Sequence, residues 1–152
     1  MFGSTTDHLV IYFSDCMTHE FEMSMIGELS YFLGLQIKQS PSGMFVSLTK
    51  YAKNLVSTFG LESAKHARTT MSTSHHLSKD SSSIDVDPSL YRSMKGSLLY
   101  LTASRPDIAL SVGVCACYQA SPKESNLLAV KRIIIYVNGT LRDGVWFSSD
   151  FT

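Results

Sequence analysis

The first apolar positions of the chain follow a helical spacing. Leu9, Phe13, Met17 and Phe21 recur every four residues, which predicts an amphipathic helix over residues 5–21. Because one side of such a helix is apolar, we expect that side to pack on something.

An alternating pattern then predicts a β-hairpin and a short helix. The apolar positions of the two strands are Leu33, Leu35 and Ile37, then Met44, Val46 and Leu48. Residues 40–43 (SPSG) supply the turn between them. A helix over residues 50–59 follows, with Thr49 as its expected N-cap and Gly60 as its stop.

Ser and Thr dominate residues 62–87, which therefore read as a flexible linker. Three helical patterns lie beyond it. Their expected inward positions are Leu90, Met94, Leu98 and Leu101; Ile108, Val112, Cys115 and Tyr118; and Leu127, Val130, Ile134 and Val137.

Local signals mark where these three helices begin and end. Asp87 caps the first before Pro88, and Pro106 opens the second. Ser121 and Glu124 form a capping box for the third, which ends at residues 138–139.

The pattern as a whole indicates an α+β fold, in which a helix and a β-hairpin precede a three-helix bundle. Residues 145–147 (VWF) predict a final strand. We divide the chain into residues 1–61, a linker over 62–87, and a helical segment over 88–152.

Composition narrows the class of protein. Thirteen basic and thirteen acidic residues balance, so any contact with a polyanion must use local basic patches. The three cysteines are unevenly spaced and favour a reducing, intracellular setting, either cytoplasmic or nuclear. No apolar stretch approaches the ~20 residues of a membrane span, so we expect no membrane contact.

Possible metal or catalytic groups each have a plainer interpretation. Asp85 and Asp87 imitate a metal pair, but Asp87 is needed as a helix cap. Cys16 and His19 lie one helical turn apart without a second pair of ligands. The His75-His76 pair falls in the linker, where solvation is the simpler reading. No phosphate loop or nucleophile elbow is present.

Basic residues on elements of defined shape are the remaining candidates for function. They could follow a phosphate backbone, although a solvated helix face gives the same pattern. The candidates for nucleic-acid binding are Lys38, Arg92, Lys95, Arg105, Lys131 and Arg132.

Several strings resemble one family closely. They are residues 21–29 (FEMSMIGEL), 32–37 (FLGLQI), 50–52 (KYA), 91–101 (YRSMKGSLLYL), 105–108 (RPDI), 121–125 (SPKES) and 129–132 (AVKR). In order and spacing they resemble the end of the palm, the thumb and the connection of copia-type retrotransposon reverse transcriptases. The likeness covers nearly the whole chain.

The resemblance implies a role in holding a primed template or RNA–DNA hybrid. Residues 32–38 would correspond to the palm hairpin that grips the primer end, and the helices after Pro88 to the thumb. Phosphate contacts hold a duplex without reading its sequence. For each of the six basic candidates, a structural salt bridge or a solvated surface position is the open alternative. Phe32, Leu33 and Leu35 are more often core than grip.

Catalysis is not expected from these residues alone. In the family, a Tyr-Val-Asp-Asp motif holds two magnesium ions, and it would precede this segment. The RNase H acids would follow residues 146–147. We expect no cofactor in this chain, and magnesium only in an intact family enzyme.

Departures from the family pattern predict weak binding. Cys117, Ile135 and Asn138 stand where the family usually has a basic residue. Each lost phosphate contact reduces affinity and its dependence on salt.

Three functions remain open at this point. The chain holds nucleic acid without catalysis, or it complements separate palm, fingers or RNase H segments, or it is an interaction module derived from a transposon.

Overall fold

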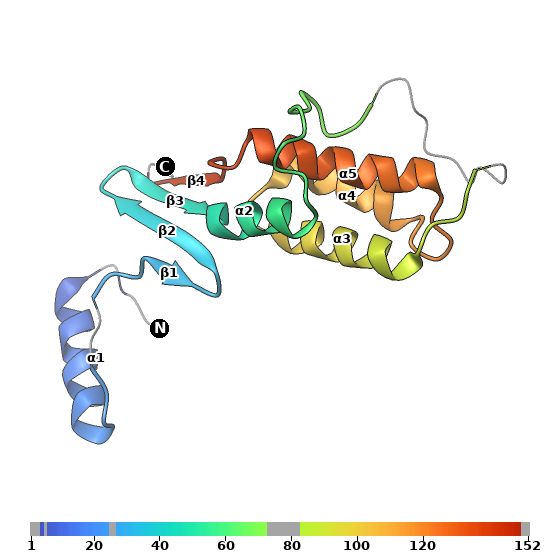
Figure 1. Ribbon diagram of the computed structural model, residues 1–152. Helices are drawn as coiled ribbons and strands as arrows, with labels where there is room; N and C mark the ends of the chain where they lie inside the picture. The colour runs from blue at the N-terminus through green and yellow to red at the C-terminus, as the bar shows by residue number, and fades with distance from the viewer. Residues whose placement is uncertain (1–3, 5, 25–26, 73–82, 150–152) are drawn as a thin grey trace.

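The computed structural model describes residues 4, 6–24, 27–72 and 83–149, and within them it has five helices and one antiparallel sheet (Figure 1). The elements are α1 (Asp7–Glu20), β1 (Tyr31–Phe32), β2 (Leu35–Ser40), β3 (Gly43–Ser47), α2 (Thr49–Thr58), α3 (Pro88–Leu101), α4 (Pro106–Ala116), α5 (Glu124–Gly139) and β4 (Val145–Ser148). The predicted α+β class is confirmed, as are the hairpin, the three helices after Pro88 and the final strand.

The sheet joins the two ends of the sequence. Its strand order is β1-β2-β3-β4, and every neighbouring pair is antiparallel. Phe45 of β3 lies opposite Trp146 of β4, so the last strand completes the sheet that the hairpin begins. Strands β2, β3 and β4 were predicted from their own patterns, but β1 and the pairing of β3 with β4 were not.

The prediction that Leu33 lies on the hairpin strand was wrong. Leu33 and Gly34 form the turn between β1 and β2, both with positive φ (48° and 83°), and Leu33 is 75% exposed. The Tyr100 hydroxyl of α3 donates to the Leu33 carbonyl oxygen at 2.6 Å. The turn thereby links the sheet to the helices.

Helices α2 to α5 share one hydrophobic core and are called the helical body below. The core residues are Leu48, Ala52, Leu55, Val56, Tyr91, Met94, Leu98, Leu101, Ile108, Val112, Cys115, Val130, Ile133, Ile134 and Val137. The core thus joins residues on both sides of the Ser/Thr-rich segment. The division into residues 1–61, 62–87 and 88–152 stays a prediction.

Most predicted inward positions are buried, but Tyr118 and Leu127 are only partly buried and Leu90 is exposed. Leu90 is 42% exposed, whereas its neighbour Tyr91 is fully buried. The Tyr91 hydroxyl donates to the Cys115 carbonyl oxygen at 2.7 Å, which satisfies its polar atom inside the core. Burial raises the pKa of Tyr91 above its usual value.

Asp87 caps α3 as predicted, because its carboxylate accepts from the backbone N–H groups of Ser89 and Leu90. The other two cap predictions were wrong. At the start of α2 the N-cap is Leu48, and the Thr49 hydroxyl instead donates to Ser47.

Helix α5 also begins differently from the prediction. Its N-cap is Lys123, not Ser121, and the Lys123 N–H donates to the Asn126 side-chain oxygen at 2.9 Å. Asn126 is buried, so the side chain that accepts this bond lies below the surface, whereas Glu124 is exposed. The end of α5 at Gly139 agrees with the prediction.

Residues 61–72, called the strap below, cross α5 and approach α4. The Asn138 side-chain amide donates to the Glu62 carbonyl oxygen at 3.0 Å, and the Ser111 hydroxyl bonds that of Thr70 at 2.7 Å. Within the described residues, the first part of the predicted linker is therefore held against the helical body. Residues 73–82 lie outside the described part.

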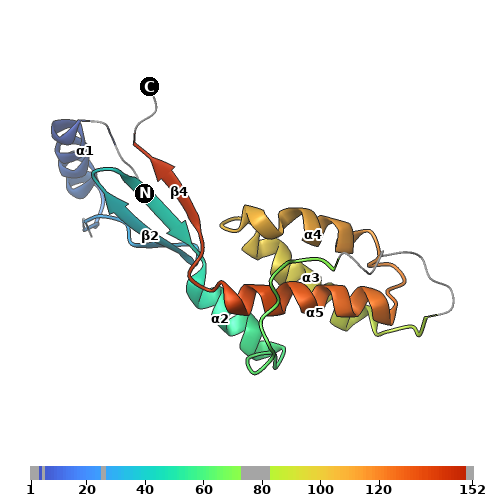
Figure 2. The same ribbon diagram turned by 90° about the horizontal axis from the view of Figure 1, so that it is seen from above.

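Helix α1 stands apart from the helical body in both views (Figures 1 and 2). None of its residues is buried, and Leu9 is 48% exposed. The helix itself was predicted correctly. Its apolar side is not buried by the described residues, so its packing stays a prediction. In the described part of the chain, no helix combines the length and apolar character needed to cross a membrane.

Candidate nucleic-acid interface

An open, basic depression lies where the strap crosses α5. Its volume is about 520 Å³. It is lined by Lys65, His66, Ala67, Arg68, Leu128, Lys131, Arg132 and Ile135. Four of these side chains carry a permanent positive charge and none is acidic, so the depression is suited to an anion.

The end of α5 fixes the position of the strap. Gly139 lets the strap pass closely, because a Cβ added there would lie 3.2 Å from both Cβ and Cγ of His66. Arg132 fastens the strap further along: its Nε donates to the Thr69 carbonyl oxygen at 3.1 Å and its Nη2 to the Thr69 hydroxyl at 3.0 Å. Two segments distant in sequence are thus brought to one surface.

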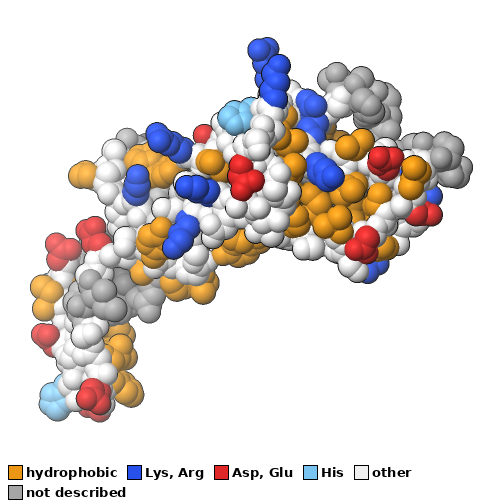
Figure 3. Space-filling view, in the orientation of Figure 1, with side chains coloured by type: hydrophobic (Ala, Val, Ile, Leu, Met, Phe, Trp, Pro, Cys, Tyr) orange, Lys and Arg blue, Asp and Glu red, His pale blue; other side chains and the backbone are white. Residues whose placement is uncertain are grey.

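The charges of the depression are available to a ligand. Arg132 uses two of its five N–H donors on Thr69, which leaves the others for an acceptor. Within the described residues, Lys65, Arg68 and Lys131 form no ion pair. Figure 3 shows Lys and Arg side chains spread along the upper side of the molecule, over the sheet, the strap and α5, whereas α1 carries acidic ones.

The six predicted binding residues do not form one site. Lys131 and Arg132 line the depression, while Lys38 is exposed on β2 opposite Phe45. Arg92 and Lys95 lie on α3, along the lower side of the helical body in Figure 1, away from the strap. Arg92 donates to the Gln119 carbonyl oxygen at 3.3 Å.

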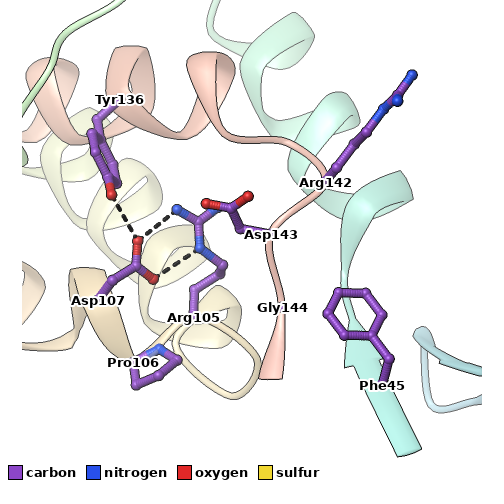
Figure 4. Close-up of a pocket in the computed structure, with 8 residues that line it drawn as sticks. All are labelled: Phe45, Arg105, Pro106, Asp107, Tyr136, Arg142, Asp143 and Gly144. Carbon is purple, nitrogen blue, oxygen red and sulfur yellow. Dashed lines mark hydrogen bonds and ion pairs between the residues drawn. The ribbon is translucent and has the colours of Figure 1, made fainter. Parts of the chain in front are cut away.

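Arg105 forms a structural salt bridge, which is the alternative to nucleic-acid binding that the sequence left open. Its side chain is 2% exposed and forms a bidentate ion pair with Asp107, at 2.9 Å and 2.7 Å (Figure 4). It also donates to the carbonyl and hydroxyl oxygens of Thr140 at 2.8 Å each. Arg105 therefore joins the start of α4 to the end of α5, and it is not presented to a phosphate backbone.

The pKa shifts of this cluster agree with its geometry. Burial alone would lower the pKa of Arg105, but the hydrogen bonds and charge of Asp107 outweigh it and raise that pKa. The hydrogen bonds from Arg105 are the main reason that the pKa of Asp107 falls below its ordinary value. The Tyr136 hydroxyl donates to Asp107 at 3.1 Å. The pKa of Tyr136 is raised, mainly by burial and secondly by this hydrogen bond.

A second depression, of about 450 Å³, lies beside this cluster, at the junction of the sheet and the helical body. It is lined by Phe45, Arg105, Pro106, Asp107, Tyr136, Arg142, Asp143 and Gly144. Arg142 points away from the Arg105–Asp107 pair in Figure 4 and, within the described residues, has no ion-pair partner.

The metal-like pairs of the sequence do not come together into a larger site. Among the described residues, no group of three or more His, Cys, Asp or Glu side chains is placed to hold a metal ion. Asp85 pairs instead with Lys123 at 2.8 Å. The His75-His76 pair lies outside the described residues. Burial raises the pKa of the Cys115 thiol to about 11, which makes it a poor nucleophile.

The strap residues Lys65, His66 and Arg68 were missed by sequence reasoning. They fall inside the segment predicted as a linker, where no apolar period signals packing. The available signal was three basic side chains within four residues, just before the Ser/Thr cluster.

Comparisons with known proteins identify relatives over most of the chain. An uncharacterized mitochondrial protein of Arabidopsis thaliana is 35% identical over 130 residues, 86% of this chain and 54% of that protein. The retrovirus-related Pol polyprotein from transposon RE1 of the same plant is 35% identical over 91% of this chain and 9% of its own length. That from transposon TNT 1-94 of Nicotiana tabacum is 29% identical over 86% of this chain and 10% of its own length.

No family model matches the chain, and no solved structure matches it. The chain spans about half the length of the mitochondrial relative and about a tenth of each Pol polyprotein.

These relatives place the protein in the class of transposon-derived proteins. More specifically, the chain is homologous to one segment of the retrovirus-related Pol polyproteins of copia-type transposons.

Proposed function

We propose that this chain is the template-holding part of a copia-type reverse transcriptase and binds the phosphate backbone of an RNA–DNA hybrid. The observation that carries the proposal is the basic depression between the strap and α5. The homology to Pol polyproteins supports it, because those proteins come from retrovirus-related elements.

The chemistry of the depression suits a phosphate backbone better than a small anion. Its cations are spread along two segments, and Leu128 and Ile135 interrupt them. A polyanion satisfies such a row one phosphate at a time and releases a counterion at each contact. No base edge needs to be read, so we expect binding that is independent of sequence.

The residues that we assign to this contact are Lys65, Arg68, Lys131 and Arg132. Arg132 has a second role, since it also positions the strap. Lys38 belongs to a separate surface, and Arg92 and Lys95 lie on α3. Arg105 is excluded from the contact by its burial and its ion pair.

The proposed function is binding of the RNA–DNA hybrid, not nucleotide addition. The 152 residues contain no Tyr-Val-Asp-Asp string, and no carboxylate lines the basic depression. Magnesium has no set of ligands among the described residues, so no catalytic step is assigned to them.

The exposed apolar side chains of α1 favour a second function, complementation by another chain. Leu9 and Tyr12, one helical turn apart on the same side of α1, are 48% and 69% exposed. An apolar helix surface of this kind marks an interaction site. Mixing the chain with separate palm and fingers segments, then measuring extension of a primed RNA, tests this function; continued absence of extension contradicts it.

Binding of a labelled, primed RNA–DNA hybrid to the full chain tests the principal function. We expect the logarithm of affinity to fall linearly with the logarithm of salt between about 50 and 200 mM, with a slope magnitude of about 3.6 for four phosphate contacts. A hybrid of unrelated sequence should give the same slope. A flat salt response, or no binding at the lowest salt, contradicts the proposal.

A further inference from the structure

The two faces of the sheet differ in chemistry. Residues opposite one another in the register share a face. One face carries Tyr31, Gln36, Lys38, Phe45, Ser47 and Trp146, and is called the aromatic face. The other carries Phe32, Leu35, Ile37, Met44, Val46, Val145 and Phe147. The sole lysine of the strands therefore lies among aromatic side chains.

Two glycines let aromatic rings approach the backbone on the aromatic face. A Cβ added to Gly43 would lie 2.8 Å from Cζ2 of the Trp146 indole. A Cβ added to Gly144 would lie 2.8 Å from Cζ of Phe45. Each ring thus lies across a glycine of the neighbouring strand segment. The glycine backbone thus packs against one side of each ring, and Trp146 remains 50% exposed.

Positive charge accompanies these rings. Lys38 lies directly opposite Phe45, and the four strands contain no acidic residue. Phe45 also lines the junction depression together with Arg142. Two carboxylates line that depression as well, but Asp107 is already bonded by Arg105 and Tyr136. The second, Asp143, is the remaining source of negative charge there.

We propose that the aromatic face binds single-stranded nucleic acid by stacking unpaired bases on Trp146 and Tyr31, with Lys38 and Arg142 contacting the backbone. Exposed aromatic rings on a sheet, interleaved with cations, are suited to this ligand because every base has a π-face. A duplex is a poor occupant, since its bases are already stacked on one another. The inference rests on the proposed nucleic-acid role and assigns the unpaired strand of a template to a surface distinct from the basic depression.

Trp146 is the sole tryptophan of the chain, so its fluorescence reports on this face directly. The probe is a single-stranded DNA of about 12 nucleotides, within the size range of known single-strand sites. We expect saturable quenching by this strand. An abasic strand of equal length and charge should leave the fluorescence unchanged, and a blunt duplex should quench weakly. Equal quenching by the abasic strand overturns the proposal, because charge alone would then account for binding.

Neighbouring residues of β4 provide a matched pair of variants. Trp146 and Phe147 are 50% and 47% exposed but lie on opposite faces. Because Trp146→Leu removes the sole tryptophan, a fluorophore-labelled strand serves as the readout for both variants. We expect Trp146→Leu to weaken single-strand binding about tenfold, and Phe147→Leu to weaken it by less than about twofold. Lys38→Gln should keep the fold and lower the salt slope for the single strand by about 0.7. Equal losses in the two β4 variants contradict the assignment of a face.

The hybrid experiment separates this inference from the proposed function. If blunt hybrid still binds with its salt slope while the single strand neither quenches nor binds, the aromatic-face proposal fails and the function stands. If quenching depends on protein concentration without added DNA, a second copy of the chain occupies the face, and the proposal is also overturned.

Discussion

The helical body differs from the region formed by α1 and the sheet in how much apolar surface it buries. In the body, four helices cover one another, and Leu98, Ile133 and Val137 are completely buried. In the other region, α1 has no buried residue, and β4 leaves two aromatic side chains about half exposed. The body therefore has a core of its own, whereas the sheet and α1 leave apolar side chains exposed.

Charge is also unevenly distributed, with a boundary at Lys38 in β2. No Lys or Arg precedes Lys38, and the acidic residues before it are Asp7, Asp15, Glu20, Glu22 and Glu28. The basic depression belongs to the body and strap. The neutral chain thus has an acidic segment before Lys38 and a net basic remainder, which includes both Lys38 and the basic depression and suits a polyanion.

The largest expected effect comes from removing a core side chain of the body. Leu98→Ala should lower the free energy of unfolding by about 3 kcal/mol, because it leaves a cavity between packed helices. Urea unfolding measures this change. Leu9→Ala in α1 is the matched control, with an expected loss below about 0.5 kcal/mol. Similar losses in the two variants would contradict the distinction between the regions.

A smaller effect is expected at the joint between α4 and α5. Asp107→Asn leaves Arg105 buried without its counter-charge, and the partial exposure of Asp107 reduces the cost to about 2 kcal/mol. Asp143→Asn, nearby but not hydrogen-bonded to Arg105, should cost less than about 0.5 kcal/mol. Urea unfolding of the three proteins tests this; equal losses would show that the ion pair is not the cause.

The Arg105–Asp107 ion pair also predicts that the stability of the protein depends on pH in the acid range. The pKa of Asp107 is lowered from an ordinary value of 3.8, so its contribution is complete above that pH and lost as pH falls through the folded-state pKa below it. The stability difference between wild type and Asp107→Asn should therefore be constant at neutral pH and shrink below about pH 4. A stability difference between the two proteins that grows in acid would contradict this account of Asp107.

The smallest expected effect is an increase in the salt dependence of hybrid binding. Ile135 lines the basic depression at a position where the family resemblance implies a basic residue. Ile135→Lys should increase the magnitude of the hybrid salt slope by about 0.9, the contribution of one added phosphate contact. Leu90→Lys, on α3, serves as the control and should leave the slope unchanged. An equal gain from both variants would indicate general charge attraction.

Local features of the fold were predictable, and long-range ones were not. The four-residue spacing predicts α1, and Asp87 before Pro88 predicts the start of α3, because both depend on neighbours in sequence. Pairing of Phe45 with Trp146 depends on residues that the helical body brings together. Burial of Arg105 depends equally on Thr140, which lies 35 positions further on.

The candidate site divides in the same way. Lys131 and Arg132 were found because they lie on a strongly periodic helix. Their partners on the strap were missed because residues 62–72 have no apolar period, and their position depends on hydrogen bonds to α5.

The most direct test is the salt slope of hybrid binding in two charge-matched double variants. Arg68→Gln with Lys131→Gln removes one arginine and one lysine from the basic depression, and Arg92→Gln with Lys95→Gln does the same on α3. We expect the first pair to reduce the slope magnitude by about 1.8 and the second to leave it within about 0.3 of wild type. Equal reductions, or a larger one in the α3 pair, would contradict the assignment of the phosphate backbone to the depression between the strap and α5.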